Sequence, residues 1–329
     1  MNPIFTLENL IRRITLTLSV FLISMLVLSA ATAEAESEIT AEQWYQQGTA
    51  YAAQGDYDHA IAAYSQVIAL QLQVPETYNS RGIVYIKKGD YDRAIADYDQ
   101  AIALNPKFAS AYNNRGVAYY AKGHYDQAIA DHSQAVALNP KNAGAYYNRG
   151  NAYGKNDQYD RAIADYTQAI ALNPKHVAAY DNRGMLYKKK GQYDQAIDDH
   201  TQAIALEPKR ATAYNNRGIA YTKKGQYNRA IADFDQAILL NPKDAMAYYN
   251  RGITYADKGD YTRAIVTYNR AIALDPHYAE AYYQKAVACE KAGRLPEAAE
   301  SYHKFILYAS TQDDEYIKIA QERLAVLGN

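Results

Sequence analysis

The sequence repeats itself with a period of 34 residues, and this period constrains the fold more than any other feature. An alanine and a proline recur with the same spacing as a glycine, and the step after the last glycine falls on Ala286. The glycines are Gly48, Gly82, Gly116, Gly150, Gly184, Gly218 and Gly252. A fixed period of this length indicates copies of one supersecondary motif that stack on one another, because a single copy cannot bury its own apolar face.

The period divides the chain into eight consecutive repeats without insertions. They cover residues 41–74, 75–108, 109–142, 143–176, 177–210, 211–244, 245–278 and 279–312. A short linker, residues 34–40, precedes them, and residues 313–329 follow them.

Each repeat is predicted to hold two helices. In repeat 109–142, apolar residues recur three or four positions apart over 109–121 and again over 125–138, which is typical of helices with one buried face. Pro140 closes the repeat, because proline ends a helix. The small residues Gly116 and Ala128 let the two helices approach closely, while tyrosines supply apolar mass around them.

The last residues, 313–329, are predicted to form a capping helix. Thr311 and Asp314 have the spacing of a capping box, and Gly328 ends the segment. One apolar stripe runs along it, with polar residues expected on the wet side: Ile317, Ala320, Leu324 and Leu327.

The N-terminal segment has the pattern of an export signal. Arg12 and Arg13 precede an apolar run over residues 14–28, which is shorter than the roughly 20 residues of a membrane-spanning helix. Ala31-Thr32-Ala33 is a small-residue cleavage pattern, so residues 1–33 are interpreted as a signal peptide. We therefore expect an exported protein, located in a periplasm, in a thylakoid lumen or outside the cell. The alternative is an uncleaved signal anchor, with residues 14–28 tethering the chain to a membrane and the repeats facing away from the cytoplasm.

The repeat resembles the tetratricopeptide repeat, whose pattern is W-x2-L-G-x2-Y, then A-x3-F, then P on a 34-residue period. Trp44, Gly48, Tyr51, Ala60 and Tyr64 match this pattern in the first repeat. The family's leucine is replaced by glutamine once and by arginine in the next six repeats. The resemblance implies an all-α fold, a right-handed superhelical α-solenoid of helix-turn-helix repeats with a C-terminal capping helix.

The substituted arginine varies together with an aspartate 16 residues later in the chain. The first repeat has Gln47 with Ala63, whereas repeats two to six have both charged residues. The pairs are Arg81 with Asp97, Arg115 with Asp131, Arg149 with Asp165, Arg183 with Asp199, and Arg217 with Asp233. We predict ion pairs between the two helices of a repeat, of the exposed kind that contributes about 0.2–1 kcal/mol each.

Neither composition nor motifs point to catalysis or to nucleic-acid binding. The 35 Lys and Arg balance 36 Asp and Glu, whereas a nucleic-acid groove is typically strongly basic. The sequence contains no phosphate-binding loop and no GxSxG, HExxH or CxxC motif. His132 and His200 occupy a packing position held by Tyr or Phe elsewhere, and Cys289 is interpreted as a packing residue. We expect no enzyme activity, no cofactor, no metal site and no nucleic-acid partner.

The resemblance places partner-binding residues on the first helix of each repeat, which lines the concave groove in the family. The sixth position is asparagine in five consecutive repeats: Asn114, Asn148, Asn182, Asn216 and Asn250. The fifth position carries Asn113, Tyr147, Asp181, Asn215 and Tyr249. Further along the same face lie Asn151, Met185, Lys155, Lys189 and Lys223. Asparagine offers both a donor and an acceptor to the main chain of an extended peptide, so a peptide or partner protein is the expected ligand.

Two alternatives remain open from the sequence. The repeated asparagine can reflect copying of one ancestral repeat, and lysine late in a helix is favoured by the helix dipole alone. The array can also be a structural or self-assembling solenoid without a ligand in its groove. The second position of the repeats carries no basic residue, which argues against a clamp that holds two carboxylates of a chain terminus.

Overall fold

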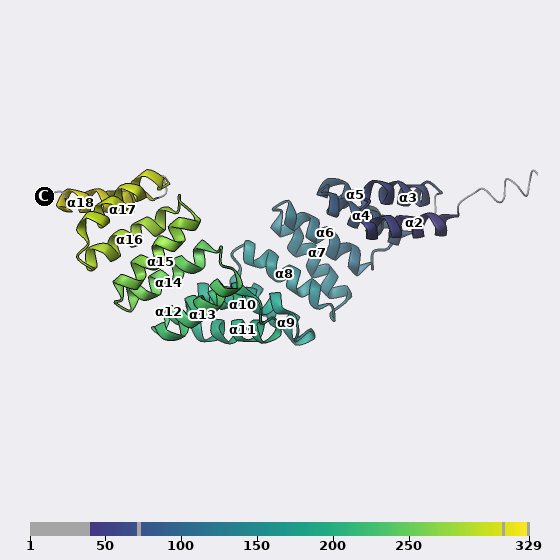
Figure 1. The fold of residues 1–329 in the computed structure, drawn as a ribbon. Coiled ribbons are helices and arrows are strands. Elements are labelled where there is room, and N and C mark those ends of the chain that lie inside the picture. The colour runs from purple at the N-terminus through teal and green to yellow at the C-terminus, as the bar shows by residue number, and fades with distance from the viewer. Residues whose placement is uncertain (1–39, 71–73, 311–312, 328–329) are drawn as a thin grey trace, which may run out of the picture. The chain divides into compact units, whose positions relative to one another are not determined.

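The computed structural model describes residues 40–70, 74–310 and 313–327. The predicted signal peptide (1–33), the linker residues before Thr40, Thr311 and Gly328 lie outside the described residues. Within them the chain forms 17 α-helices and no strand (Figure 1). None of these helices is both long enough and apolar enough to cross a bilayer.

The chain falls into two compact units, which are described separately. The N-terminal unit ends at Lys122 and holds α2 (Ala41–Gln54), α3 (Tyr57–Ala69), α4 (Pro75–Lys88), α5 (Tyr91–Leu104) and α6 (Ala109–Ala121). The C-terminal unit begins at Gly123 and holds α7 (Tyr125–Leu138), α8 (Ala143–Lys155), α9 (Tyr159–Leu172), α10 (Val177–Lys189), α11 (Tyr193–Leu206), α12 (Ala211–Lys223), α13 (Tyr227–Leu240), α14 (Ala245–Asp257), α15 (Tyr261–Leu274), α16 (Ala279–Lys291), α17 (Leu295–Tyr308) and α18 (Asp314–Leu327).

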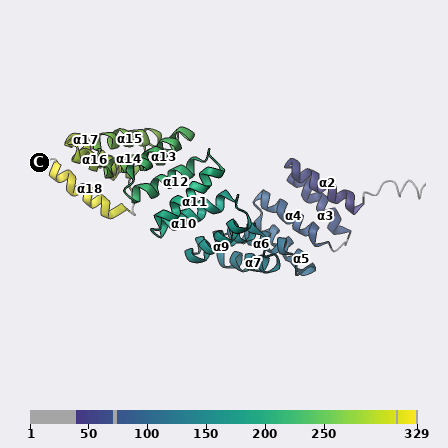
Figure 2. The ribbon, with the colours of Figure 1, turned by 90° about the horizontal axis from the view of Figure 1, so that it is seen from below.

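The even-numbered helices α2 to α16 are the first helices of their repeats, and the odd-numbered helices are the second. The bounds of α6 and α7 coincide with the ranges that the apolar spacing predicts. Within the C-terminal unit, α10 contacts α11 of its own repeat and also α9 of the preceding repeat, and α12 contacts α11 and α13 in the same way (Figure 2). Each first helix of the C-terminal unit therefore packs against two second helices.

A glycine on each first helix allows a second helix to approach it closely. Tyr98 and Tyr268 are fully buried, and their rings lie directly on Gly82 and Gly252. A β-carbon at Gly252 would lie 2.5 Å from the ring of Tyr268, which is inside van der Waals contact. The last repeat departs from the rule, with a buried Ala286 at this position.

The predicted ion pairs are confirmed for Arg81, Arg149, Arg183 and Arg217. Nε of Arg149 donates to Asp165 at 2.7 Å and Nη2 donates to the other carboxylate oxygen at 2.8 Å, while Nη1 donates to Ser133 of the preceding repeat at 3.2 Å. The guanidinium also lies 5.5 Å from the ring centroid of Tyr146. One arginine thus joins α7, α8 and α9.

The expectation that these pairs are exposed was wrong. Asp165 is only 6% exposed. The hydrogen bonds that Arg149 donates to Asp165 raise the pKa of Arg149. A paired carboxylate at this depth becomes a destabilising group once its arginine is removed.

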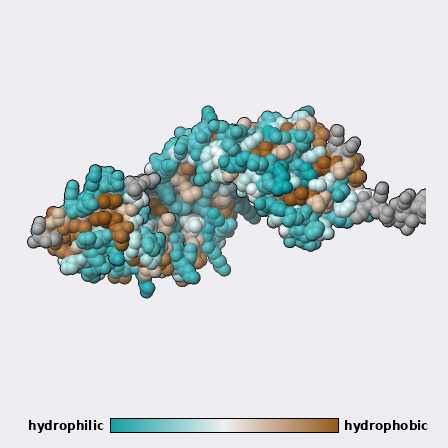
Figure 3. Space-filling model, turned by 90° about the horizontal axis from the view of Figure 1, so that it is seen from above, coloured by the Kyte–Doolittle hydropathy of each residue, from teal (hydrophilic) through white to brown (hydrophobic). Residues whose placement is uncertain are grey.

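The terminal helix α18 packs on the end of the array, as predicted. Only one of its two sides has the predicted character. Its stripe packs against Tyr302 and Phe305 of α17, with Ala320 fully buried. Its other side is not uniformly polar: Tyr316, Ile319 and Val326 are exposed. Hydrophobic residues accordingly gather at this end of the C-terminal unit (Figure 3).

Replacing Gly252 by alanine should destabilise the fold by about 1–3 kcal/mol, because the added methyl group overlaps the Tyr268 ring. Gly154→Ala in α8 is the matched control. A β-carbon there would have 3.8 Å to its nearest neighbour, so the alanine should stabilise its helix by about 0.5–1 kcal/mol. Urea unfolding followed by circular dichroism measures both changes. Equal effects of the two variants would contradict the packing argument.

Arg149→Ala should lower the free energy of unfolding by about 3 kcal/mol, because buried Asp165 loses its partner. Arg251→Ala should cost less. Thr267 stands where repeats two to six have aspartate, so Arg251 pairs only with half-exposed Asp235 and its Nε has no partner within the described residues. Thermal and urea midpoints of the two variants give the comparison, and a larger loss for Arg251→Ala would refute it.

Candidate functional site

The sixth-position asparagines connect successive first helices. Nδ2 of Asn182 on α10 donates to the hydroxyl of Tyr147 at 3.2 Å and to Oδ1 of Asn151 at 2.9 Å, both on α8. Nδ2 of Asn250 on α14 donates to Oδ1 of Asn215 on α12 at 3.1 Å. We call the surface formed by the fifth, sixth, ninth and twelfth positions of α8, α10, α12 and α14 the first-helix surface.

The N-terminal unit contains the same type of contact, from Nδ2 of Asn114 on α6 to Oδ1 of Asn79 on α4 at 3.0 Å. Asn113 and Asn148 are half-buried and both are engaged in contacts. We call the sixth-position asparagines Asn114, Asn148, Asn182, Asn216 and Asn250 the asparagine ladder. Hydrogen bonds of this ladder connect one repeat to the next, a role that the sequence alone did not indicate. Each amide still keeps hydrogen-bonding capacity, because one amide group carries two donor hydrogens and an acceptor oxygen.

The fifth-position tyrosines Tyr147 and Tyr249, which were expected to contact a partner, pack partly against neighbouring side chains. The Tyr147 ring lies 4.6 Å from the ring of His176, and the Tyr249 ring lies 5.0 Å from that of Tyr278, measured between centroids. Burial raises the pKa of Tyr249 to about 12, so its hydroxyl stays protonated at neutral pH. Both rings are half-buried, so only part of each ring is accessible to a partner.

The three lysines that were expected to contact a partner lie at the C-terminal ends of their first helices. Lys155, Lys189 and Lys223 are exposed. Lys189 turns toward α9, where its Nζ lies 4.3 Å from the centroid of the Tyr159 ring and contacts the Tyr159 hydroxyl. It is therefore directed to the second helix of the preceding repeat and not to the ladder.

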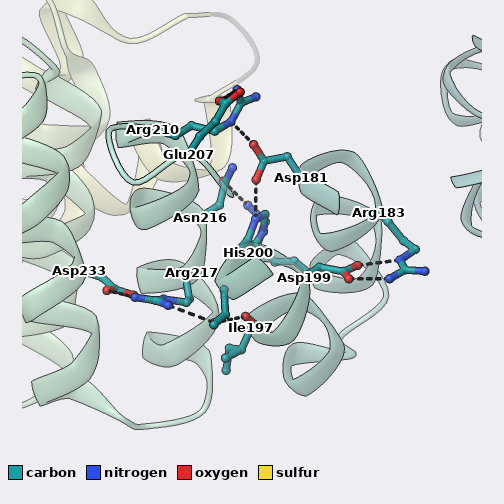
Figure 4. Close-up of polar contacts among 12 residues, drawn as sticks. Asp181, Arg183, Ile197, Asp199, His200, Glu207, Arg210, Asn216, Arg217 and Asp233 are labelled. Atoms are coloured by element: carbon teal, nitrogen blue, oxygen red, sulfur yellow. Dashed lines mark hydrogen bonds and ion pairs between the residues drawn. The ribbon is translucent and has the colours of Figure 1, made fainter. Parts of the chain in front are cut away.

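Asp181 does not point outward as the sequence pattern suggested. It is 4% exposed, and one of its carboxylate oxygens lies 3.1 Å from Nδ1 of His200. The other oxygen accepts a hydrogen bond from Nε of Arg210 (Figure 4). Asn215 is also buried, at 8% exposed. Neither side chain presents more than a small area to a partner.

A basic residue that the sequence reasoning missed lies on the first-helix surface. Lys188, at the twelfth position of its repeat, is half-buried and donates from Nζ to Oδ1 of Asn216 at 3.1 Å. Burial lowers the pKa of Lys188. The available signal was that no other repeat has a basic residue at the twelfth position.

The titratable side chains offer no centre for metal or redox chemistry within the described residues, where no three His, Cys, Asp or Glu side chains come together to hold an ion. Cys289 is fully buried with Ala264 and Ile265, and burial raises the pKa of its thiol. A reactive cysteine needs the opposite shift. Burial also lowers the pKa of His132 to about 4, with a further contribution from the charge of Arg149.

Models of one repeat family match the chain from residue 48 to residue 300. Those described as TPR repeat match residues 48–89, 84–123, 118–157 and 184–225. Those described as tetratricopeptide repeat match residues 143–176, 211–244, 245–278, 165–198 and 267–300. The chain belongs to the tetratricopeptide repeat family.

Solved structures of other tetratricopeptide repeat proteins resemble the fold. A repeat protein from Parabacteroides merdae is 21% identical, with a TM-score of 0.57, and the match covers 78% of this chain and 99% of that one. YrrB, described as a TPR protein with an unusual peptide-binding site, is 25% identical with a TM-score of 0.52, over 57% of this chain and 97% of that one. A chain of the APC/C hetero-tetramer Cut9–Hcn1 is 19% identical with a TM-score of 0.56, over 80% of this chain and 52% of that one. A search of curated proteins found no match.

His132→Tyr should remove a pH dependence from the stability of this repeat protein. Tyrosine holds the equivalent position in five repeats, so the ring fits. Because the folded-state pKa of His132 lies near 4 and the unfolded-state pKa near 6.5, its neutral form stabilises the fold above pH 6.5. This stability is lost as the pH falls through the folded-state pKa.

The tyrosine variant should therefore gain stability relative to the parent chain between pH 6.5 and about 4, by up to about 3 kcal/mol. Urea midpoints of both chains at several pH values give the difference. A difference that stays constant over this range would show that His132 is not buried in its neutral form.

Proposed function

We propose that this tetratricopeptide repeat protein is a non-enzymatic scaffold or assembly factor that binds an extended peptide or a partner protein on its first-helix surface. The main support is the asparagine ladder. It presents amide groups at a regular spacing along successive first helices. The amide oxygens of Asn182 and Asn250 keep acceptor capacity beyond the bonds that their NH2 groups donate within the array. An extended main chain has donors and acceptors at regular spacing as well.

Exposed apolar residues accompany these amides. Met185 at the ninth position of α10 is 39% exposed, and Met246 near the start of α14 is 56% exposed. Methionine adapts its shape to a partner and is common on peptide-binding surfaces. The relatives support the same proposal: YrrB is described by its peptide-binding site, and Cut9 by its complex with Hcn1.

We place this binding function outside the cytoplasm. The support is the sequence pattern of Arg12, Arg13, the apolar run 14–28 and the small residues at 31–33. An uncleaved run would tether the same surface to a membrane.

One observation favours the self-assembling alternative. The terminal helix α18 exposes Tyr316, Ile319 and Val326, and a helix face of this kind can pack against a second copy. Light scattering over a range of protein concentrations separates the two functions. A mass that grows with concentration, and falls back after Val326→Lys, would favour assembly through α18.

Met185→Arg should abolish partner binding, because a long charged side chain then projects from the middle of the first-helix surface. Leu239→Arg is the matched control. Leu239 is 70% exposed on α13, which is a second helix, so the same kind of change is made away from the first-helix surface. The full chain and both variants would be used as bait for exported and envelope fractions, with captured polypeptides identified by mass spectrometry. Circular dichroism would confirm equal folding.

A polypeptide captured by the parent chain and by Leu239→Arg, and lost with Met185→Arg, is the expected result. Loss with Leu239→Arg alone would move the binding surface to the second helices. Equal capture by all three chains would exclude the first-helix surface.

A further inference from the structure

The asparagine ladder is interrupted at Asn216. In the repeats on either side, Asn182 and Asn250 donate to the fifth-position residue of the preceding repeat. For Asn216 that residue is Asp181, whose two carboxylate oxygens contact His200 and Arg210 (Figure 4). Asn216 contacts Lys188 instead.

The orientation of the Asn216 amide follows from this contact. A lysine ammonium group has three donors and no acceptor, so the amide must turn its oxygen toward Lys188. The NH2 group of Asn216 then points away from Lys188. Unlike Nδ2 of Asn182 and of Asn250, it donates to no side chain within the described residues.

Lys188 is a half-buried cation without a counter-ion. It makes no ion pair within the described part of the chain, and its one hydrogen-bond partner is the neutral amide of Asn216. The neighbouring lysines differ, because Lys190 pairs with Asp160 and Lys224 pairs with Asp194. Removing a cation from water is unfavourable unless an anion compensates it, so this position favours a negatively charged ligand.

We propose that Lys188 and Asn216 form a subsite for a carboxylate group of the bound peptide. One carboxylate oxygen accepts a hydrogen bond from Nζ of Lys188, and the other accepts one from Nδ2 of Asn216. Met185 lies one turn before Lys188 on α10 and offers apolar contact to the flanking peptide residues. The subsite rests on the proposed function, since it selects among peptides that the first-helix surface binds.

The carboxylates near the subsite already have cationic partners, and Glu207 shares Arg210 with Asp181. Asp181 on α10 is occupied by His200 and Arg210, and Asp199 on α11 is paired with Arg183. The arrangement differs from a two-carboxylate clamp, because a single lysine late in the first helix provides the charge. We expect an acidic side chain within the peptide to be the ligand, and a free C-terminal carboxylate is the other source of the same chemistry.

The first experiment selects peptides on the full chain. A phage library of random dodecapeptides, each fused at its C-terminus, would be panned on the chain tethered through its own C-terminus, with Met185→Arg as the counter-selection. Enriched peptides that share an aspartate or glutamate at a fixed place are expected. If no peptide is enriched, the proposed function itself fails. If peptides are enriched without an acidic residue, peptide binding stands and the carboxylate subsite is refuted.

The second experiment is a double-mutant cycle. One enriched peptide would be synthesised with its acidic residue or with the corresponding amide, each with an amidated C-terminus, and a third version would combine the amide side chain with a free C-terminal carboxylate. Each is titrated against the parent chain, Lys188→Met, and Lys190→Met as the matched control. Methionine keeps the length of the lysine stem and removes the charge, and Lys190 faces Asp160 instead of the subsite.

The parent chain should bind the acidic peptide at least about tenfold more tightly than its amide version. Lys190→Met should keep this preference and Lys188→Met should lose it, with both variants still binding the amide peptide equally. Restored affinity from the free C-terminus, lost again in Lys188→Met, would assign the subsite to a chain terminus and overturn the side-chain assignment. An acidic preference that survives Lys188→Met would overturn the subsite altogether.

Discussion

On the first helices α2, α4, α8, α10, α12 and α14, a glycine lies against an aromatic ring of the paired second helix, and the rest of the array depends on this contact. The Tyr98 and Tyr268 rings are fully buried there because no β-carbon holds the helices apart. With the ring flat on the glycine, the small alanines of both helices come within packing distance. The close approach also brings the arginine of the first helix within reach of an aspartate on the second.

The arginines add a directional constraint to this packing. Apolar contacts alone would tolerate some sliding of one helix along another, whereas a two-pronged bond between Arg149 and Asp165 fixes the register of α8 against α9. The third bond, to Ser133, carries the same register to the preceding repeat. A regular C-terminal unit follows from this local geometry, because each of its first helices contacts the second helices on both of its sides.

The sequence predicted those features that depend on residues within one repeat. The bounds of α6 and α7 and four of the five Arg–Asp pairs were correct, since the copies repeat the same local signals and Gln47 with Ala63 shows the pair changing together. The burial of Asp165 was missed, because the depth of a side chain depends on how the helices pack and not on the residues of one helix. Asp181 looked like a groove residue from its position alone. Its inward direction depends on His200 and Arg210, which lie 19 and 29 residues away.

These departures bear on whether the first-helix surface is only a copied ancestral pattern. Copying predicts that repeats agree, yet the fifth repeat alone has aspartate at its fifth position, lysine at its twelfth and arginine at its last. The three changes form one arrangement. Asp181 joins His200 and Arg210, Asn216 donates to no side chain of the preceding repeat within the described residues, and Lys188 binds the Asn216 amide oxygen. A half-buried lysine that makes no ion pair within the described part of the chain destabilises the fold, and this supports the proposal that Lys188 and Asn216 bind a ligand.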